Sequence, residues 1–182
     1  MAHHVCPFWV GYFLASPLRR LYEKPEKMLA PFLKEGMTAV DYGCAMGFFT
    51  LPMARMVGPH GKIIAVDLQE KMLSRMEKRA RRAGLSDRIE PVLADSGGAR
   101  IQGPVDFVAA LYVVHELPDA KEFFSQMRSI MKPGAKLFMV EPAPRVTEAE
   151  FAESVNLAAS TGLELIEETE AGRGRGALLL SP

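Results

Sequence analysis

The chain has 182 residues, of which 48% are hydrophobic and 24% are charged, a composition typical of a soluble globular protein with a sizeable core. Its 22 Lys and Arg residues balance 22 Asp and Glu residues, which argues against a broad basic surface for nucleic acid. The apolar runs fall short of the roughly 20 residues that cross a bilayer, and no basic region resembling a signal peptide begins the chain. We therefore expect one cytoplasmic domain over residues 1–182, with no membrane span and no nucleic-acid partner.

The chain contains two cysteines, Cys6 and Cys44, whose spacing indicates no disulfide framework. Cys6 lies close to His3 and His4, but this set lacks a fourth metal ligand. The sequence therefore predicts no metal site, and Cys44 is interpreted as a small residue of a turn rather than as a redox thiol.

Short β-rich runs alternate with helical stretches from Thr38 onward. Several of the runs are continuously apolar, as expected of strands that are buried on both faces. The predicted strands are Thr38–Tyr42, Lys62–Asp67, Ile89–Ala94, Val105–Leu111, Ala135–Glu141, Leu163–Glu168 and Gly176–Leu180.

Helices are predicted between these strands, most clearly over Gln69–Ala83 and Asp119–Met131. Strand–helix alternation of this kind favours a parallel sheet with helices on both faces. The last two strands are separated only by residues 169–175, too few for a crossover helix, so they should form an antiparallel hairpin. The expected fold is a doubly wound α/β domain with a mostly parallel seven-stranded sheet that ends in this hairpin.

Residues 1–36 precede the first strand and are expected to form a helical cap, with its main helix over Leu18–Leu33. The beginning of this segment is rich in aromatic residues, and the seven predicted strands leave it no place in the sheet. We expect it to cover the ligand crevice as a lid, with Trp9 and Tyr12 binding the substrate. Docking against an outer helix and a contact in a homodimer are the alternatives.

The strongest local pattern is the run from Asp41 to Gly47, which follows a strand and opens a helix. Small residues at positions 43, 45 and 47 allow a sharp turn and a close approach of the backbone to a ligand. The amide groups at the start of the helix then favour an anionic or polar ligand. The spacing differs from the G-x-G-x-x-G pattern of nicotinamide sites, which disfavours a dehydrogenase.

Two further acidic residues end predicted strands at the same edge of the sheet. Asp67 can accept hydrogen bonds from both hydroxyls of a ribose, and it also fits the N-cap of the following helix. Asp95 can accept a hydrogen bond from an adenine amino group, and it also fits a turn.

These residues together resemble the class I S-adenosylmethionine-dependent methyltransferases. The run Asp41-x-Gly43-Cys44-Ala45-x-Gly47 resembles their first motif, D-x-G-C-G-x-G, and Lys132-Pro-Gly134 resembles their K-P-G-G entry to the fifth strand. The segment from Val105 to Asp119 resembles their fourth strand and the loop after it. Within the family the chain resembles the small-molecule enzymes, such as the ubiquinone and menaquinone C-methyltransferases. The resemblance implies S-adenosylmethionine as cofactor, a small-molecule acceptor, and cofactor contacts from Asp41, Gly43, Cys44, Ala45, Gly47, Asp67, Leu68, Asp95, Ser96 and Leu111.

The chain departs from the family pattern at Ala45, which replaces a glycine, and at Leu111, which replaces a polar residue. The expected reaction is an in-line methyl transfer, for which alignment in a dry pocket supplies most of the catalysis. Tyr112 and His115 follow the fourth strand and are the candidate catalytic residues: Tyr112 would flank the acceptor and His115 would remove its proton. A role for His115 in fixing the loop is the alternative. Three other functions stay open: a nicotinamide-dependent oxidoreductase, a non-catalytic binding module and an RNA methyltransferase.

Overall fold

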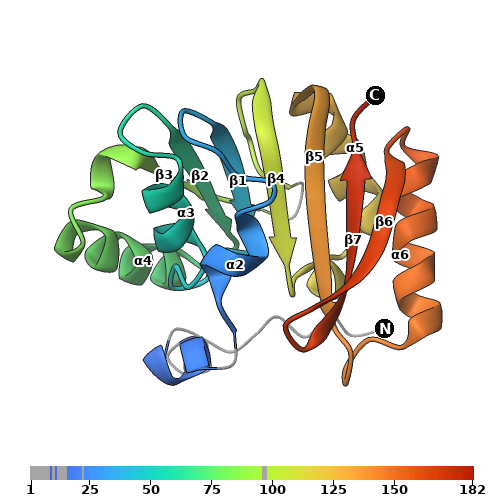
Figure 1. Cartoon of the computed structure of the whole chain (residues 1–182), viewed down its shortest axis with the longest axis horizontal. Helices are drawn as coiled ribbons and strands as arrows, with labels where there is room; N and C mark the ends of the chain where they lie inside the picture. The colour runs from blue at the N-terminus through green and yellow to red at the C-terminus, as the bar shows by residue number, and fades with distance from the viewer. Residues whose placement is uncertain (1–8, 10, 12–15, 22, 96–97) are drawn as a thin grey trace.

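A computed structural model describes residues 9, 11, 16–21, 23–95 and 98–182 of the chain. Its centre is a seven-stranded sheet in the order β3-β2-β1-β4-β5-β7-β6 (Figure 1). Strands β1 to β5 pair in parallel, whereas β7 is antiparallel to both β5 and β6, as the sequence predicts. The strands are β1 (Thr38–Tyr42), β2 (Lys62–Asp67), β3 (Ile89–Leu93), β4 (Val105–Leu111), β5 (Met131–Pro142), β6 (Glu164–Ala171) and β7 (Gly174–Leu180).

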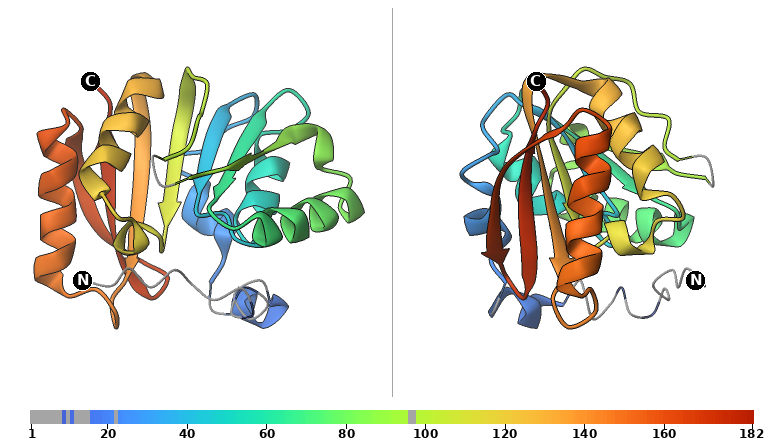
Figure 2. Two further views of the ribbon diagram at one scale, coloured as in Figure 1. Left: turned by 180° about the vertical axis from the view of Figure 1, so that it is seen from behind. Right: turned by 90° about the vertical axis from the view of Figure 1, so that its right-hand side faces the viewer.

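Helices cover both faces of the sheet (Figure 2). One apolar core packs α5 (Ala120–Ile130) and α6 (Glu148–Ser160) against the sheet. The other core packs α2 (Pro25–Leu29), α3 (Thr50–Met56) and α4 (Glu70–Arg82) against the opposite face. The doubly wound α/β architecture is thereby confirmed, and no described helix is long and apolar enough to cross a membrane.

The predicted main helix over Leu18–Leu33 is wrong. The described part of this segment holds a short 3-10 helix, η1 (Pro17–Leu21), and the five-residue α2. The break falls before Pro25, where Lys24 has the extended backbone angles φ −111° and ψ 92°. The cause is steric, because a proline ring disfavours the helical conformation of the residue before it.

The connection from β3 to β4 also differs from a regular strand–helix alternation. Its described residues contain an isolated bridge between Asp95 and Gly98 and no helix. Strand β3 is consequently less buried than its neighbours, and Leu93 at its end is 54% exposed.

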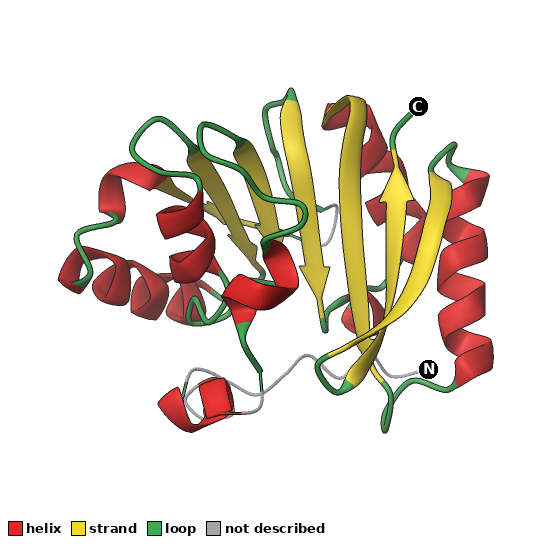
Figure 3. Ribbon diagram, in the orientation of Figure 1, coloured by secondary structure: helices red, strands yellow, loops and turns green. Residues whose placement is uncertain are grey.

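The loops that follow β1, β2, β4 and β5 gather at the carboxyl ends of the parallel strands, at the lower edge of the sheet in Figure 3. The turn between β1 and α3 has positive φ at three alternate residues: 79° at Gly43, 45° at Ala45 and 81° at Gly47. Glycine adopts this left-handed region without strain, whereas the Cβ of Ala45 carries a steric cost. The alternate small residues are therefore required by the path of the turn itself.

Substituting Ala45→Gly should raise the free energy of unfolding by about 0.5–1 kcal/mol, because relief of the left-handed strain exceeds the added entropy of the unfolded chain. Urea denaturation measures the change. The matched control is Ala152→Gly on the exposed face of α6, which should lower stability by about 1 kcal/mol. Equal destabilisation by both substitutions would contradict the strain at Ala45.

Candidate functional site

A cavity of about 380 Å³ opens at the carboxyl ends of the strands. This volume lies within the range of small-molecule sites in proteins. Its walls come from the N-terminal segment, from the turns after β1 and β2, from the end of β4 with η3 (Val114–Glu116), and from the loops after β5 and β6.

Many of the residues singled out in the sequence meet at this cavity: Gly43, Cys44, Ala45, Asp67, Leu68, Leu111, Tyr112 and His115. Asp41 and Gly47 belong to the same turn but do not line the cavity. Asp95 is exposed one residue after Ala94, which does line it, and Trp9 is 72% exposed without contributing to the wall. Tyr12 and Ser96 lie outside the described residues.

Asp67 connects the two turns at one end of the cavity. Its Oδ2 accepts the backbone N–H of Ala45 at 2.9 Å, and its Oδ1 accepts that of Gln69 at 2.8 Å. Burial raises the pKa of this carboxyl, and the two backbone hydrogen bonds oppose the rise. Each oxygen retains a lone pair, so the carboxylate can accept two further donors from a ligand.

Asp41 lies beneath the turn and is 2% exposed. Its Oδ2 accepts the hydroxyl of Thr50 at 2.5 Å, which joins the end of β1 to the first residue of α3. Burial raises the pKa of Asp41 to about 6, although the Thr50 hydrogen bond opposes the rise and the charge of Asp67 adds to it. From this position Asp41 can support the turn from below. Cys44 is likewise buried, and burial raises the pKa of its thiol, as befits an unreactive side chain.

Tyr112 begins the loop after β4 with φ 63°, a strained value for a residue other than glycine. Its N–H donates to the carbonyl of Val140 at 2.6 Å, and its hydroxyl donates to the carboxylate of Glu23. Burial and the Glu23 carboxylate raise the pKa of Tyr112 above its ordinary range. Both effects favour the neutral phenol.

The N-terminal segment contributes two charged side chains to the cavity wall. Arg19 Nε donates to Glu23 Oε2 at 2.5 Å, and both side chains are largely buried. The guanidinium carbon of Arg19 lies 4.3 Å from the ring centre of Phe48, a cation–π contact. Upstream, an added Cβ at the buried Gly11 would lie 2.8 Å from Sδ of Met72 and 2.9 Å from Cε of Met46, both of which line the cavity.

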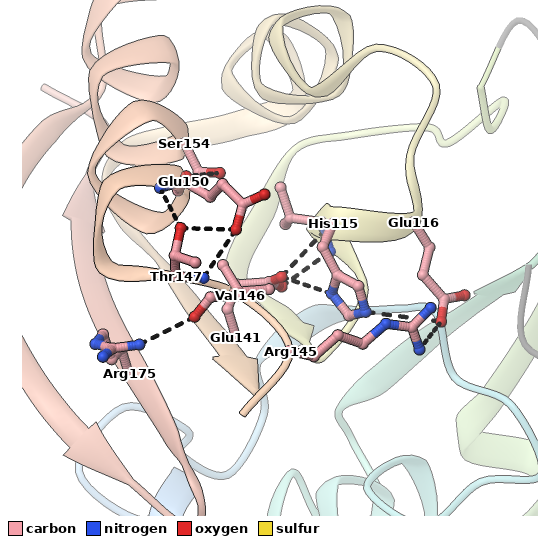
Figure 4. A network of polar contacts seen from close by, with 10 residues as sticks. His115, Glu116, Glu141, Arg145, Val146, Thr147, Glu150, Ser154 and Arg175 are labelled. Atoms are coloured by element: carbon pink, nitrogen blue, oxygen red, sulfur yellow. Dashed lines mark hydrogen bonds and ion pairs between the residues drawn. The ribbon is translucent and has the colours of Figure 1, made fainter. Parts of the chain in front are cut away.

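His115 also lines the cavity, with Glu141 beside it (Figure 4). Glu141 is 1% exposed, and its carboxylate accepts the N–H groups of Val114 at 3.0 Å and of His115 at 3.1 Å. His115 Nδ1 lies 2.6 Å from Glu141 Oε2. Because a carboxylate only accepts hydrogen bonds, Nδ1 is the donor in this contact, and in the neutral imidazole Nε2 would keep the lone pair. Nε2 is 3.8 Å from Glu116 Oε1, beyond hydrogen-bond distance.

Sequence reasoning missed Glu141 and the charged residues Arg19, Glu23, Glu116, Arg145 and Arg173 of the wall. Glu141 ends an apolar strand at the edge that was expected to bind ligand, and that position was the available signal. Arg19 and Glu23 belong to the N-terminal segment, Glu116 to the three-residue η3, and Arg145 and Arg173 to loops. None of these stretches carries a periodic pattern in the sequence. The described residues contain no cluster of His, Cys, Asp and Glu suited to a metal ion.

The chain matches the model of the methyltransferase domain family over residues 33–171. It is 33% identical to the ubiquinone biosynthesis O-methyltransferase of Caulobacter vibrioides over 137 residues, which are 75% of this chain and 52% of that protein. It is 28% identical to the demethylmenaquinone methyltransferase of Lactobacillus johnsonii, over 60% of this chain and 45% of that protein. The chain thus spans about half the length of these curated relatives.

A solved structure supports the same assignment over nearly the whole chain. The crystal structure of an S-adenosylmethionine-dependent methyltransferase from Aquifex aeolicus superposes with a TM-score of 0.88 and 25% identity, covering 98% of this chain and 100% of that one. Three observations point to the same family: the seven-stranded sheet with its terminal hairpin, the turn after β1, and the match to the family model. The chain belongs to the class I S-adenosylmethionine-dependent methyltransferase family.

Proposed function

We propose that the protein transfers a methyl group from S-adenosylmethionine to a small organic acceptor. The observation that carries the proposal is the Asp67 carboxylate, which faces the cavity while it holds the amides of Ala45 and Gln69. Its remaining lone pairs suit the two hydroxyls of a ribose. The backbone of the turn can approach the rest of the cofactor closely. The proposed contacts are Gly43, Cys44, Ala45, Leu68 and Leu111, and Asp41 supports the turn from below.

When bound, S-adenosylmethionine supplies an electrophilic methyl group on a sulfonium. The protein's own contribution is alignment and exclusion of water, for which the apolar parts of the wall at Met72, Val113 and Leu117 are suited. A small acceptor related to a quinone is supported by the names of two relatives, which refer to ubiquinone biosynthesis and to demethylmenaquinone. We also propose that the reaction takes place in the cytoplasm.

We assign the removal of the acceptor's proton to His115. Glu141 fixes the imidazole with Nδ1 protonated and leaves Nε2 to accept a proton at the cavity, an arrangement like that of other carboxylate–histidine pairs. Tyr112 is proposed to flank the acceptor as a neutral phenol whose hydroxyl donates a hydrogen bond to Glu23. The acceptor atom is therefore expected to be one that carries a removable proton, such as a hydroxyl or an amine.

The N-terminal segment is proposed to cover the cavity as a lid. Gly11 is buried against Met46 and Met72, and Arg19 and Glu23 already belong to the wall. Trp9 and Tyr12 remain proposed substrate contacts, and residues 1–36 remain the proposed cap on a core of residues 37–182.

Replacement of Asp67 by alanine should weaken binding of S-adenosylmethionine by about 1.5–3 kcal/mol, because hydrogen bonds to a charged partner are lost. Isothermal titration calorimetry measures the affinity. Asp87→Ala, at an exposed aspartate of η2 (Ser86–Arg88), is the control and should bind like the unchanged protein. Unaltered affinity in Asp67→Ala would exclude the ribose role.

The substitution His115→Asn should lower the methylation rate by roughly 100-fold or more and abolish the limb of the pH–rate profile that reports the imidazole. Glu141→Gln should lower the rate in the same direction, because the ring loses the partner that fixes its proton. Both variants should retain cofactor affinity. If His115→Asn keeps the limb and loses only thermal stability, His115 serves the loop and not the reaction.

Gly11→Val should weaken cofactor binding by roughly ten-fold, since the added side chain displaces Met46 and Met72 from the cavity wall. In the Met72→Ala background, Gly11→Val should weaken cofactor binding much less than it does in the unchanged protein. A double-mutant cycle measures this difference. Affinity that is insensitive to Gly11→Val would argue that the segment does not cover the site.

A further inference from the structure

One arginine of the basic helix α4 reaches the turn after β1. The helix carries six Lys and Arg residues, and five of them are exposed: Lys71, Arg75, Lys78, Arg81 and Arg82. The sixth, Arg79, is partly buried, and its Nη1 donates to the backbone carbonyl of Met46. Because Met46 lines the cavity, this contact joins an outer helix to the wall of the site.

The face of α4 that carries Arg79 packs against the turn. Met72, Met76 and Arg79 follow one another at steps of four and three residues, which places them on one side of the helix. Met72 lines the cavity, and a Cβ added to Gly47 would lie 2.8 Å from Cγ of Met76. The helical period therefore directs Arg79 toward the turn.

The peptide unit between Met46 and Gly47 is fixed at both of its ends. Its N–H donates to the carbonyl of Cys44 at 2.9 Å, and its carbonyl accepts from Arg79. On one side of this unit Ala45 has a left-handed φ of 45°, and on the other Gly47 has a φ of 81°. The conformation at Ala45 is costly and persists only where its surroundings hold it.

A guanidinium is chemically suited to hold this carbonyl. Met46 is 2% exposed, and a buried carbonyl that lacks a donor costs free energy. The hydrogen bond from Arg79 is charge-assisted and is therefore stronger than one between neutral groups. Asp67 and Arg79 thus hold the turn through opposite charges, since the carboxylate accepts the N–H of Ala45 and the guanidinium donates to the next carbonyl.

We propose that Arg79 is a positioning residue for the cofactor, which fixes the part of the turn that receives the amino-acid end of S-adenosylmethionine. The proposal rests on the proposed function, because it takes this turn as the cofactor site and Asp67 as the contact with the ribose. Arg79 does not line the cavity, so it acts through the backbone of Met46 and not through a contact of its own with the cofactor.

The test compares two ligands that share the adenosine part and differ at the amino-acid end: S-adenosylhomocysteine and 5′-methylthioadenosine. Calorimetry measures the affinity of each for the unchanged protein and for Arg79→Met, which keeps much of the side-chain length and loses the donor. Arg79→Met should bind S-adenosylhomocysteine roughly ten-fold more weakly and methylthioadenosine within about two-fold of the unchanged protein. Arg79→Lys should retain part of the affinity for S-adenosylhomocysteine, because an ammonium group can still donate to the carbonyl.

Two further variants are controls. Arg82→Met removes an exposed cation from the same helix and should bind both ligands like the unchanged protein. Asp67→Ala removes the proposed contact with the ribose, which both ligands contain, so it should weaken the binding of both.

Amide hydrogen exchange gives a readout that needs no ligand. In Arg79→Met the amide of Gly47 should exchange roughly ten-fold faster than in the unchanged protein, because its peptide unit has lost one of two anchors. The amide of Leu73, which donates to the carbonyl of Gln69 at 3.2 Å within α4, is the internal reference and should exchange at an unchanged rate.

Three results would overturn the proposal. The first is an unchanged ratio of the two affinities in Arg79→Met, whether both affinities stay or both fall. The second is an equal change of that ratio in Arg82→Met, which would assign the effect to the charge of the helix. The third is unaltered exchange at Gly47 in Arg79→Met. If the unchanged protein binds neither ligand, the proposed function fails instead, and the exchange rate of Gly47 still decides the role of Arg79.

Discussion

The hydrogen bonds of Asp67 join the turn after β1 to the turn after β2, and the cofactor end of the cavity depends on this junction. The turn after β1 contains Ala45 at a left-handed φ of 45°, a conformation that costs free energy unless its surroundings hold it. The Ala45 N–H is held by Asp67 Oδ2, and the turn is supported from below by the buried pair of Asp41 and Thr50. Removing the Asp67 carboxylate would therefore loosen the turn as well as remove the proposed contact with the ribose.

The buried carboxylate of Glu141 has the same structural function beside His115, where the acceptor is proposed to bind. Glu141 accepts two backbone amides of η3 and the imidazole of His115, so the end of β5 fixes the loop after β4. In both cases a side chain at the carboxyl end of one parallel strand holds the loop that follows its neighbour. The sheet thus places an oriented imidazole and an oriented carboxylate at the same edge, in the wall of one cavity.

Much of this arrangement was predictable from the sequence, because buried parallel strands leave continuous apolar runs. The predicted bounds of Thr38–Tyr42, Lys62–Asp67 and Val105–Leu111 agree with β1, β2 and β4. The terminal hairpin followed from the short gap between its strands. The helix over Leu18–Leu33 was wrong because the local restriction before Pro25 outweighs the apolar content of the segment.

The site was predictable only in part, because the strand pattern does not determine how the loops pack. Residues next to strand ends, such as Asp67 and His115, are positioned by the sheet, whereas the positions of Arg19, Arg145 and Arg173 depend on how loops pack against one another. Glu141 was overlooked because a single acidic residue at the end of a buried strand does not reveal its partner, which lies 26 residues earlier.

The cofactor is the central claim, and competitive calorimetry with S-adenosylmethionine and NAD on the unchanged protein tests it most directly. The account predicts selective binding of S-adenosylmethionine, because Asp67 and the turn from Gly43 to Gly47 suit its ribose and its amino-acid end. Tighter binding of NAD, or no binding of S-adenosylmethionine at millimolar concentration, would contradict it.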